Sequence, residues 1–185
     1  MAQRSTIHRV HIELADTDRQ VYETIQMSIA RADSETAHRL VARLIAYCVW
    51  FEEGIAFTGG VGAGDEPDVW VRDPDGRVRV WIEVGLPDSA RLAKAARHSA
   101  RVVVLAYGKS LPRWEKDHLA SLQSLSNITV AELDPALLEA LVARLDRIVS
   151  WELTVSGGAL YLTTSGAAFE GTLRPVCGVL PGPSD

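Results

Sequence analysis

Residues 101–107, with the sequence RVVVLAY, constrain the fold of this chain more than any other segment. Their apolar side chains follow one another almost without interruption, whereas a strand with one face in water alternates apolar and polar residues. A run of this kind is typical of a strand that is buried on both faces of a sheet. We therefore expect a central strand here, with further layers of structure covering both of its faces.

Helices and strands alternate on both sides of this central strand. A strand is expected at 77–84 before it, followed by a helix through about 98 that Asp88 or Ser89 can cap. After it we expect a helix near 111–124, a strand at 127–132 and a helix at 135–148. This β-α-β-α-β-α order implies parallel neighbouring strands joined by right-handed crossovers. The middle of the chain therefore predicts an α/β fold.

The two ends of the chain add further strands. Residues 6–15 and 20–31 alternate as half-buried strands do, and the longest helix follows at 34–53 with Ser34 as its N-cap. Strands are expected at 150–156 and 159–164, with a short one at 168–173 and an irregular tail from about 175 to 185. We therefore predict a single domain over residues 1–185, in which helices flank a mixed sheet with extra N- and C-terminal strands.

The composition sets limits on location and partners. Of the 185 residues, 47% are hydrophobic and 23% are charged, and no apolar run approaches the ~20 residues that span a bilayer. The N-terminus enters an alternating strand pattern rather than the apolar core of a signal peptide, so we expect a cytoplasmic protein in which Cys48 and Cys177 are unpaired thiols. The net charge of −5 argues against a protein that coats DNA through phosphate contacts. It leaves room for a local basic groove or a smaller phosphorylated substrate.

Residues 68–84 predict a β-hairpin, preceded by a flexible glycine-rich connector at 59–64 that lacks the ending of a phosphate-binding P-loop. Pro74 fixes φ for a turn and Gly76 tolerates a positive φ, so the chain can reverse between the strands 68–73 and 77–84. One register gives the hairpin a mostly apolar face, and a slip by one residue would mix its two faces. This register pairs Val69 with Ile82, Val71 with Val80, Asp73 with Val78, Trp70 with Trp81, Arg72 with Arg79 and Asp68 with Glu83.

The last of these pairs carries the chemistry of the hairpin. Directly opposed Cβ atoms lie roughly 5 Å apart, and two like charges at this distance are destabilising. A bound cation, a nearby Lys or Arg, or protonation of one carboxyl would offset the repulsion between Asp68 and Glu83. Their oxygens suit Mg²⁺ or Mn²⁺. The alternative is an ordinary salt-bridge cluster that involves Arg72, Arg79, Arg91 or Lys94.

The spacing of this pair is similar to a nuclease signature, Pro-Asp followed by (Asp/Glu)-x-Lys. Pro67-Asp68 and Glu83-Val84 match it, but Gly85 stands at the lysine position. Lys94 lies about two turns into the next helix and could reach back to replace the missing lysine, or it could belong to a solvated helix face. A lysine there would orient water and offset charge on a phosphate. Glu35 in the first turn of the long helix is either a further metal ligand or a residue that favours the helix dipole.

These segments together resemble the YaeQ family of small bacterial proteins. The resemblance rests on the strand opening at 2–16, Ser34-Glu35-Thr36, Asp65-Glu66-Pro67 and the run 81–88, WIEVGLPD, and it extends through Lys94 to the C-terminal strands. It implies a variant of the restriction-endonuclease-like fold of the PD-(D/E)xK superfamily. It also implies that Glu35, Asp68 and Glu83 lie at a metal-binding edge. The family has no established activity to carry over to this chain.

Three hypotheses follow for the function. The leading one is a Mg²⁺-dependent phosphodiesterase or nuclease-like enzyme, in which Asp68 and Glu83 hold the metal, Glu35 assists, and Lys94 stabilises the attacking water or the phosphate. The alternative is a non-catalytic binding module that acts through a protein or nucleic-acid partner. In the third, the acidic cluster is purely structural.

Overall fold

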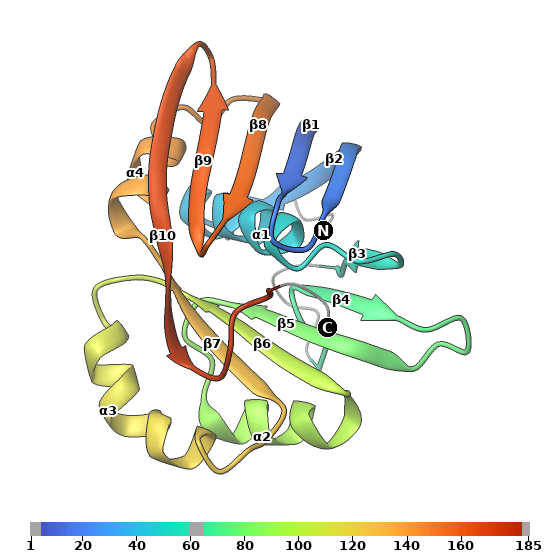
Figure 1. Ribbon diagram of the computed structural model, residues 1–185, viewed down its shortest axis with the longest axis vertical. Helices are drawn as coiled ribbons and strands as arrows, with labels where there is room; N and C mark the ends of the chain where they lie inside the picture. Colours follow the sequence, from blue (N-terminus) through green and yellow to red (C-terminus); the bar gives the residue numbers. More distant parts are fainter. Residues whose placement is uncertain (1–4, 60–64, 183–185) are drawn as a thin grey trace.

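In the computed structural model, which describes residues 5–59 and 65–182, ten strands form one curled sheet (Figure 1). Their order in the sheet is β2-β1-β8-β9-β10-β7-β6-β5-β4-β3. The strands are β1 (Ser5–Asp16), β2 (Val21–Ala32), β3 (Ile55–Phe57), β4 (Val69–Arg72), β5 (Val78–Val84), β6 (Arg101–Ala106), β7 (Ile128–Leu133), β8 (Ile148–Ser156), β9 (Ala159–Thr164) and β10 (Ala167–Cys177). The helices are α1 (Ala37–Val49), α2 (Ser89–His98), α3 (Leu111–Leu122) and α4 (Pro135–Val142).

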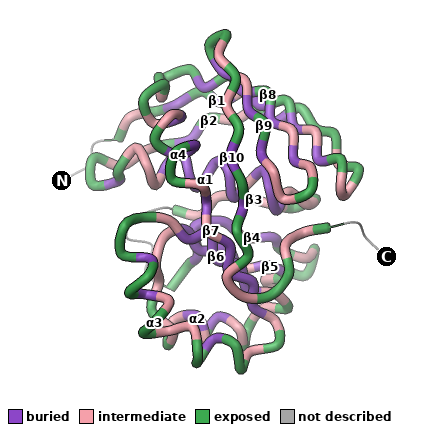
Figure 2. The backbone as a smooth tube through the Cα atoms, turned by 60° about the vertical axis from the view of Figure 1, so that its left-hand side comes forward, coloured by how far each residue is buried: buried purple, intermediate pink, exposed green. Residues whose placement is uncertain are grey.

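Strand β10 joins the two halves of the sheet. Its first part, through Thr172, pairs with β9, and its second part, from Leu173, pairs with β7. Figures 1 and 2 show β10 crossing from the half that contains β1, β2, β8 and β9 to the half that contains β3 to β7. The sheet is mixed: β5, β6 and β7 are parallel neighbours and β1 runs parallel to β8, whereas the other neighbouring strands are antiparallel. The expected single-domain α/β fold with a mixed sheet is confirmed.

Helix α1 lies inside the curl and is buried nearly all around. Leu40, Leu44 and Ile45 belong to one core with residues of both halves of the sheet, such as Ile12 and Val103. Most residues of this helix after Arg39 are apolar, and a helix of this kind is stable only when it is covered on nearly every side, which explains its central position. It begins later than expected, because the Thr36 side chain rather than Ser34 caps it by accepting a hydrogen bond from the Arg39 backbone N–H.

Helices α2 and α3 cover the outer face of the parallel strands. Leu92 of α2 and Trp114 of α3 form a second core with Val102 and Val104 of β6. Because Val103 of the same strand faces the first core, β6 is buried on both faces as its sequence predicts. Asp88 caps α2, as expected, by accepting a hydrogen bond from the Arg91 backbone N–H.

Two expected elements have different bounds, and one strand is additional. Helix α4 ends at Val142 rather than 148, because i→i+3 hydrogen bonds from Arg144 and Leu145 tighten the chain before it turns into β8. Strand β10 is longer than the expected short strand, since its second half gains β7 as a partner. The short strand β3 was not expected. Most of the glycine-rich connector, residues 60–64, lies outside the described residues.

The β4–β5 hairpin has the expected register over most of its length. Val69 pairs with Ile82, Trp70 with Trp81 and Val71 with Val80, and the apolar face is buried. A bulge near the turn then pairs Arg72 with Val78, so the expected Arg72–Arg79 and Asp73–Val78 pairs are wrong. None of the helices in the described part of the chain is long and apolar enough to cross a membrane.

Candidate functional site

Three buried carboxylates lie where α1 begins and β5 ends. Glu35 precedes α1, Asp68 precedes β4, and Glu83 is the second-last residue of β5. The hairpin continues past the end of β4, because the Asp68 backbone N–H donates to the Ile82 carbonyl at 3.0 Å. The Asp68 carboxylate turns across the strand and accepts the Val84 backbone N–H at 2.8 Å. Asp68, just before β4, is therefore held next to the end of β5, where Glu83 lies.

Two arginines of α1 neutralise Asp68 and Glu35. Arg39 Nη2 donates to Asp68 Oδ1 at 2.6 Å, and Arg43 Nη1 donates to Glu35 Oε1 at 3.0 Å. Arg43 Nε also lies 3.8 Å from Asp68 Oδ1, so one guanidinium bridges both acids. Because neither Glu35 nor Asp68 is exposed to bulk water, these arginines supply the charge compensation that burial demands.

Glu83 has its own partners. Its Oε1 accepts one hydrogen bond from the Trp81 indole N–H at 2.8 Å and another from Arg91 Nε at 2.7 Å. Burial raises the pKa of Glu83, and the negative charge of Asp68 adds to this effect against the opposing pull of Trp81 and Arg91. A carboxyl with a raised pKa beside a second carboxylate is typical of functional sites, although structural ion pairs also produce it.

Lys94 does not contact these carboxylates. Its Nζ lies 2.9 Å from Asp65 Oδ1, and its side chain is 60% exposed. Arg91, three residues earlier on α2, takes the place beside Glu83 that the sequence suggested for Lys94. The structure thus brings together Glu35, Asp68 and Glu83, and leaves Lys94 at the surface beyond them.

The backbone at Gly85 explains why this position is not a lysine. Gly85 has a φ of +104°, which L-residues rarely adopt. A Cβ placed there would meet Arg39 Nη1 at 3.7 Å, and the same Nη1 donates to the Val84 carbonyl at 3.0 Å. Arg39 therefore puts a positive charge close to the position that the lysine has in the nuclease signature.

Arg39 and Arg43 were missed in the sequence, although one signal was present. Arg43 interrupts an otherwise apolar stretch of helix, and a charged residue in such a place needs a buried partner. Arg39 and Arg43 are four residues apart, which aligns them along one side of α1. Arg91 was foreseen only as one of four possible salt-bridge partners.

The donor set can be compared with what a divalent ion needs. Among the described residues, no group of three or more His, Cys, Asp or Glu side chains is placed to hold a metal ion. Both oxygens of Asp68 accept hydrogen bonds. In Glu35 and Glu83, only Oε1 accepts a hydrogen bond from a described residue. A divalent ion held at this edge would therefore have at most two protein carboxylates as close ligands, fewer than the six ligands that Mg²⁺ takes.

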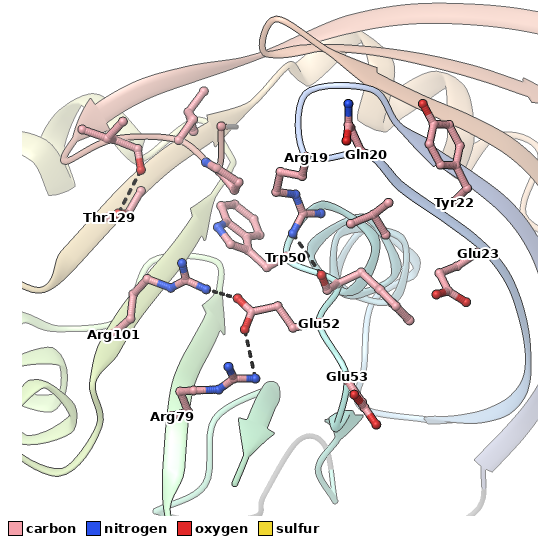
Figure 3. Close-up of a pocket in the computed structure, with 16 residues that line it drawn as sticks. Arg19, Gln20, Tyr22, Glu23, Trp50, Glu52, Glu53, Arg79, Arg101 and Thr129 are labelled. Atoms are coloured by element: carbon pink, nitrogen blue, oxygen red, sulfur yellow. Dashed lines mark hydrogen bonds and ion pairs between the residues drawn. The ribbon is translucent and has the colours of Figure 1, made fainter. Parts of the chain in front are cut away.

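A separate pocket lies at the other end of α1 (Figure 3). It has a volume of about 910 Å³ and is lined by the β1–β2 turn, the end of α1, and residues 179–182 of the C-terminal segment. Figure 3 shows Glu52 between Arg79 and Arg101, with an ion pair to each, while Arg19 Nη1 donates to the Phe51 carbonyl at 2.9 Å. This second charge cluster is distinct from the carboxylate site.

Known proteins similar to this chain share one description. The family model described as YaeQ protein matches residues 1–173. A protein of Salmonella typhi described as uncharacterized protein YaeQ is 33% identical over 164 residues, which cover 88% of this chain and 91% of the relative. Its counterpart in Escherichia coli K12 is 32% identical with the same shares covered.

Solved structures agree over almost the whole fold. The crystal structure of YaeQ protein from Pseudomonas syringae has a TM-score of 0.92 and 38% identity, covering 96% of this chain and 99% of that one. The structure of YaeQ protein from Xanthomonas axonopodis pv. citri has a TM-score of 0.91 and 30% identity, covering 95% and 100%. The family match and these relatives extend over most of the chain, and the chain therefore belongs to the YaeQ family.

Proposed function

We propose that this chain is a Mg²⁺- or Mn²⁺-dependent phosphodiesterase with nuclease-like chemistry. Asp68 and Glu83 would hold the ion, with Glu35 assisting from the start of α1. The observation that carries the proposal is the placement of two buried carboxylates side by side, Asp68 just before β4 and Glu83 near the end of β5, where burial raises the pKa of Glu83 and the charge of Asp68 adds to this effect. A divalent cation would relieve this repulsion.

The residues at this edge fit a divalent ion with few protein ligands. Glu83 Oε2 and Glu35 Oε2 accept no hydrogen bond from described residues, and carboxylate oxygens are the ligands that Mg²⁺ and Mn²⁺ prefer. The ion, when bound, would polarise a phosphoryl oxygen and lower the pKa of a coordinated water. This placement of the acids is also what supports the assignment to a restriction-endonuclease-like core.

The arginines at the site would bind the substrate. The side chains of Arg39 and Arg91 are 30% and 29% exposed, so part of each arginine reaches solvent beside a buried carboxylate, while Arg39 Nε itself is buried. A guanidinium presents two parallel N–H donors to a phosphate and holds it in a fixed orientation. Lys94, farther out on α2, would attract and position the phosphate at the rim rather than contact the reacting atoms.

A cleavage assay tests this proposal. Metal-free protein is incubated with end-labelled DNA and RNA, with and without Mg²⁺ or Mn²⁺, alongside the Asp68→Asn and Glu83→Gln variants. We expect metal-dependent cleavage that both substitutions lower by about 100-fold or more, a typical loss for a residue that acts in the transition state. Cleavage that survives both substitutions would show that another site is responsible.

The alternative is a non-catalytic binding module on the same fold. One observation favours it: Glu35, Asp68 and Glu83 each already have an arginine partner, so the cluster is compensated without a metal. This alternative predicts no metal-dependent cleavage and a stable complex with a protein or nucleic-acid partner. Metal titration separates the two functions, because the binding module needs no ion affinity from Asp68 and Glu83.

A further inference from the structure

Strand β2 forms one edge of the sheet and is unusually long, and its first residues, Val21 to Glu23, line a pocket with other segments of the chain. It has 12 residues, all paired with β1 on one side, and it is the first strand in the sheet order. Along its other side, no backbone hydrogen bond reaches another described residue between Val21 and Arg31. Natural edge strands are commonly blocked by Pro, Lys, bulges, short length or inward-pointing charges, of which β2 has only the last, in Glu23 and Arg31. The sequence of β2, VYETIQMSIARA, contains no Pro, Lys or Gly, and its pairing with β1 has no bulge.

The two faces of β2 differ in polarity, one largely apolar and buried and the other largely polar and exposed. Ile25 and Ile29 are buried in the main core, and Met27 between them is partly buried against it. The side chains in between, such as Gln26 and Ser28, are exposed. A strand added to this edge must therefore place apolar residues on the core side and polar residues on the other side.

The charges on β2 are arranged symmetrically about Met27. Glu23 lies four residues before Met27 and Arg31 lies four residues after it, both on the core side of the strand. Neither side chain forms an ion pair with a described residue, and Arg31 Nε is buried without a hydrogen-bond partner. In an antiparallel pair of two copies centred on Met27, Glu23 would lie opposite Arg31 of the second copy, and the symmetry would repeat this ion pair.

We propose that two copies of this chain dimerise by antiparallel pairing of their β2 edges, centred on Met27. The same register places Ile25 opposite Ile29 of the second copy, which continues the apolar face across the interface. A shift by two residues would set Glu23 opposite Ile29, or Arg31 opposite Ile25, and would lose the ion pairs. Along eleven paired positions the strands would form about ten backbone hydrogen bonds, joining the two sheets into one.

Site-directed cross-linking tests the register. In a Cys177→Ser background, which leaves only the buried Cys48, Met27→Cys places two thiols opposite each other, within reach of a disulfide. Thr24→Cys is the matched control, because the two copies of position 24 would lie six residues apart along the strand, about 20 Å. We expect a disulfide-linked dimer from Met27→Cys and little from Thr24→Cys. Equal cross-linking of the two variants, or none from Met27→Cys, would overturn the proposal.

A charge swap tests the interface without new covalent bonds. Sedimentation velocity of the wild-type protein at rising concentration should show a dimer. Glu23→Arg and Arg31→Glu should each raise the dimer Kd by about tenfold, because two attractive pairs become repulsive. The double swap should restore the wild-type Kd, and Glu152→Arg on the exposed face of the internal strand β8 should leave it unchanged.

Three results would contradict the dimer. These are a wild-type protein that stays monomeric at all concentrations, single reversals without effect on Kd, and a double swap that is no better than the single variants. Capture of an extended peptide by a monomer would also contradict it, because the edge would then serve a different partner. Circular dichroism of each variant confirms that it remains folded.

Discussion

Helix α1 has a charge cluster at each end, and the two clusters differ in depth. At its beginning, the side chains of Glu35, Arg43 and Asp68 are 1%, 2% and 3% exposed. At its end, the side chains of Glu52, Arg79 and Arg101 are 25%, 43% and 42% exposed. Both clusters join acids to arginines across elements that are distant in sequence, but only the first lies in the core between the halves of the sheet.

The difference in depth shows where charge is retained at a cost in stability. Water and salt screen the exposed cluster, so its ion pairs contribute little to stability. The buried cluster bears a desolvation penalty that apolar residues of similar volume would avoid. Acids kept at such a place are candidates for chemistry, whereas the Glu52 cluster is explained by surface pairing alone.

Removing Arg43 should have the largest effect on stability. Arg43→Met leaves Glu35 buried without its cation, and breaking a buried pair in this way costs about 3–5 kcal/mol. Arg101→Met removes the corresponding arginine from the exposed cluster and should cost at most about 1 kcal/mol. Urea unfolding of both variants measures the difference in the free energy of unfolding. Equal losses of stability would show that burial does not make the first cluster more important for stability than the exposed one.

Removing both partners of the buried pair should recover much of this loss. The Glu35→Met/Arg43→Met double variant has no unpaired buried charge, so we expect it to be more stable than Arg43→Met by about 2 kcal/mol or more. A double-mutant cycle from urea unfolding gives the coupling energy. A double variant less stable than either single variant would mean that Arg43 acts mainly through Asp68.

The stability contribution of Glu83 should depend on pH. Because the pKa of Glu83 is raised in the folded protein, folding favours its protonated form. The stabilisation that the protonated carboxyl gives to the folded state is therefore fully present below the ordinary pKa of 4.5, and it is lost as the pH rises through the pKa of the folded state. The free energy of unfolding of the wild type, measured relative to that of Glu83→Gln, should therefore fall with rising pH across this window. The Glu52→Gln variant controls for loss of a half-exposed carboxylate. A pH-independent difference between the wild type and Glu83→Gln would contradict the raised pKa.

The smallest effect on stability is expected at Lys94. Its pair with Asp65 is exposed on both sides, so Lys94→Met should leave the melting temperature unchanged within error. Under the proposed function, the same variant should raise KM for a phosphodiester substrate and change kcat little, since Lys94 lies at the rim. A large fall in kcat with unchanged KM would place Lys94 at the reacting atoms instead.

Much of the fold could be predicted because local patterns agreed with it. The apolar run of β6, the alternation in β1 and β2, and the Asp88 cap each reflect the residues of one segment. The length of β10 could not be predicted, because its second half depends on pairing with β7, which lies far away in the sequence. The start of α1 was misplaced because Ser34 and Thr36 are both good caps and only the fold selects one.

The candidate site could be predicted only in part, for a similar reason. The pairing of Val69 with Ile82 follows from alternation alone, and it puts Asp68 and Glu83 at the neighbouring positions of the hairpin. The partners of these acids come from α1 and α2, and no pattern in the hairpin specifies which arginine reaches them. The sequence favoured Lys94 over Arg91, although the two lie less than one helical turn apart, because it cannot show that Asp65 pairs with Lys94.

The most direct test of the carboxylate site is Mn²⁺ binding, measured by calorimetry on the metal-free protein. We expect the wild type to bind one ion with a Kd below millimolar, and Asp68→Asn and Glu83→Gln each to weaken binding by about tenfold or more. Glu52→Gln, from the exposed cluster at the other end of α1, should bind as the wild type does. Wild-type binding weaker than millimolar, or binding unaffected by either of the first two substitutions, would contradict a metal site at Asp68 and Glu83.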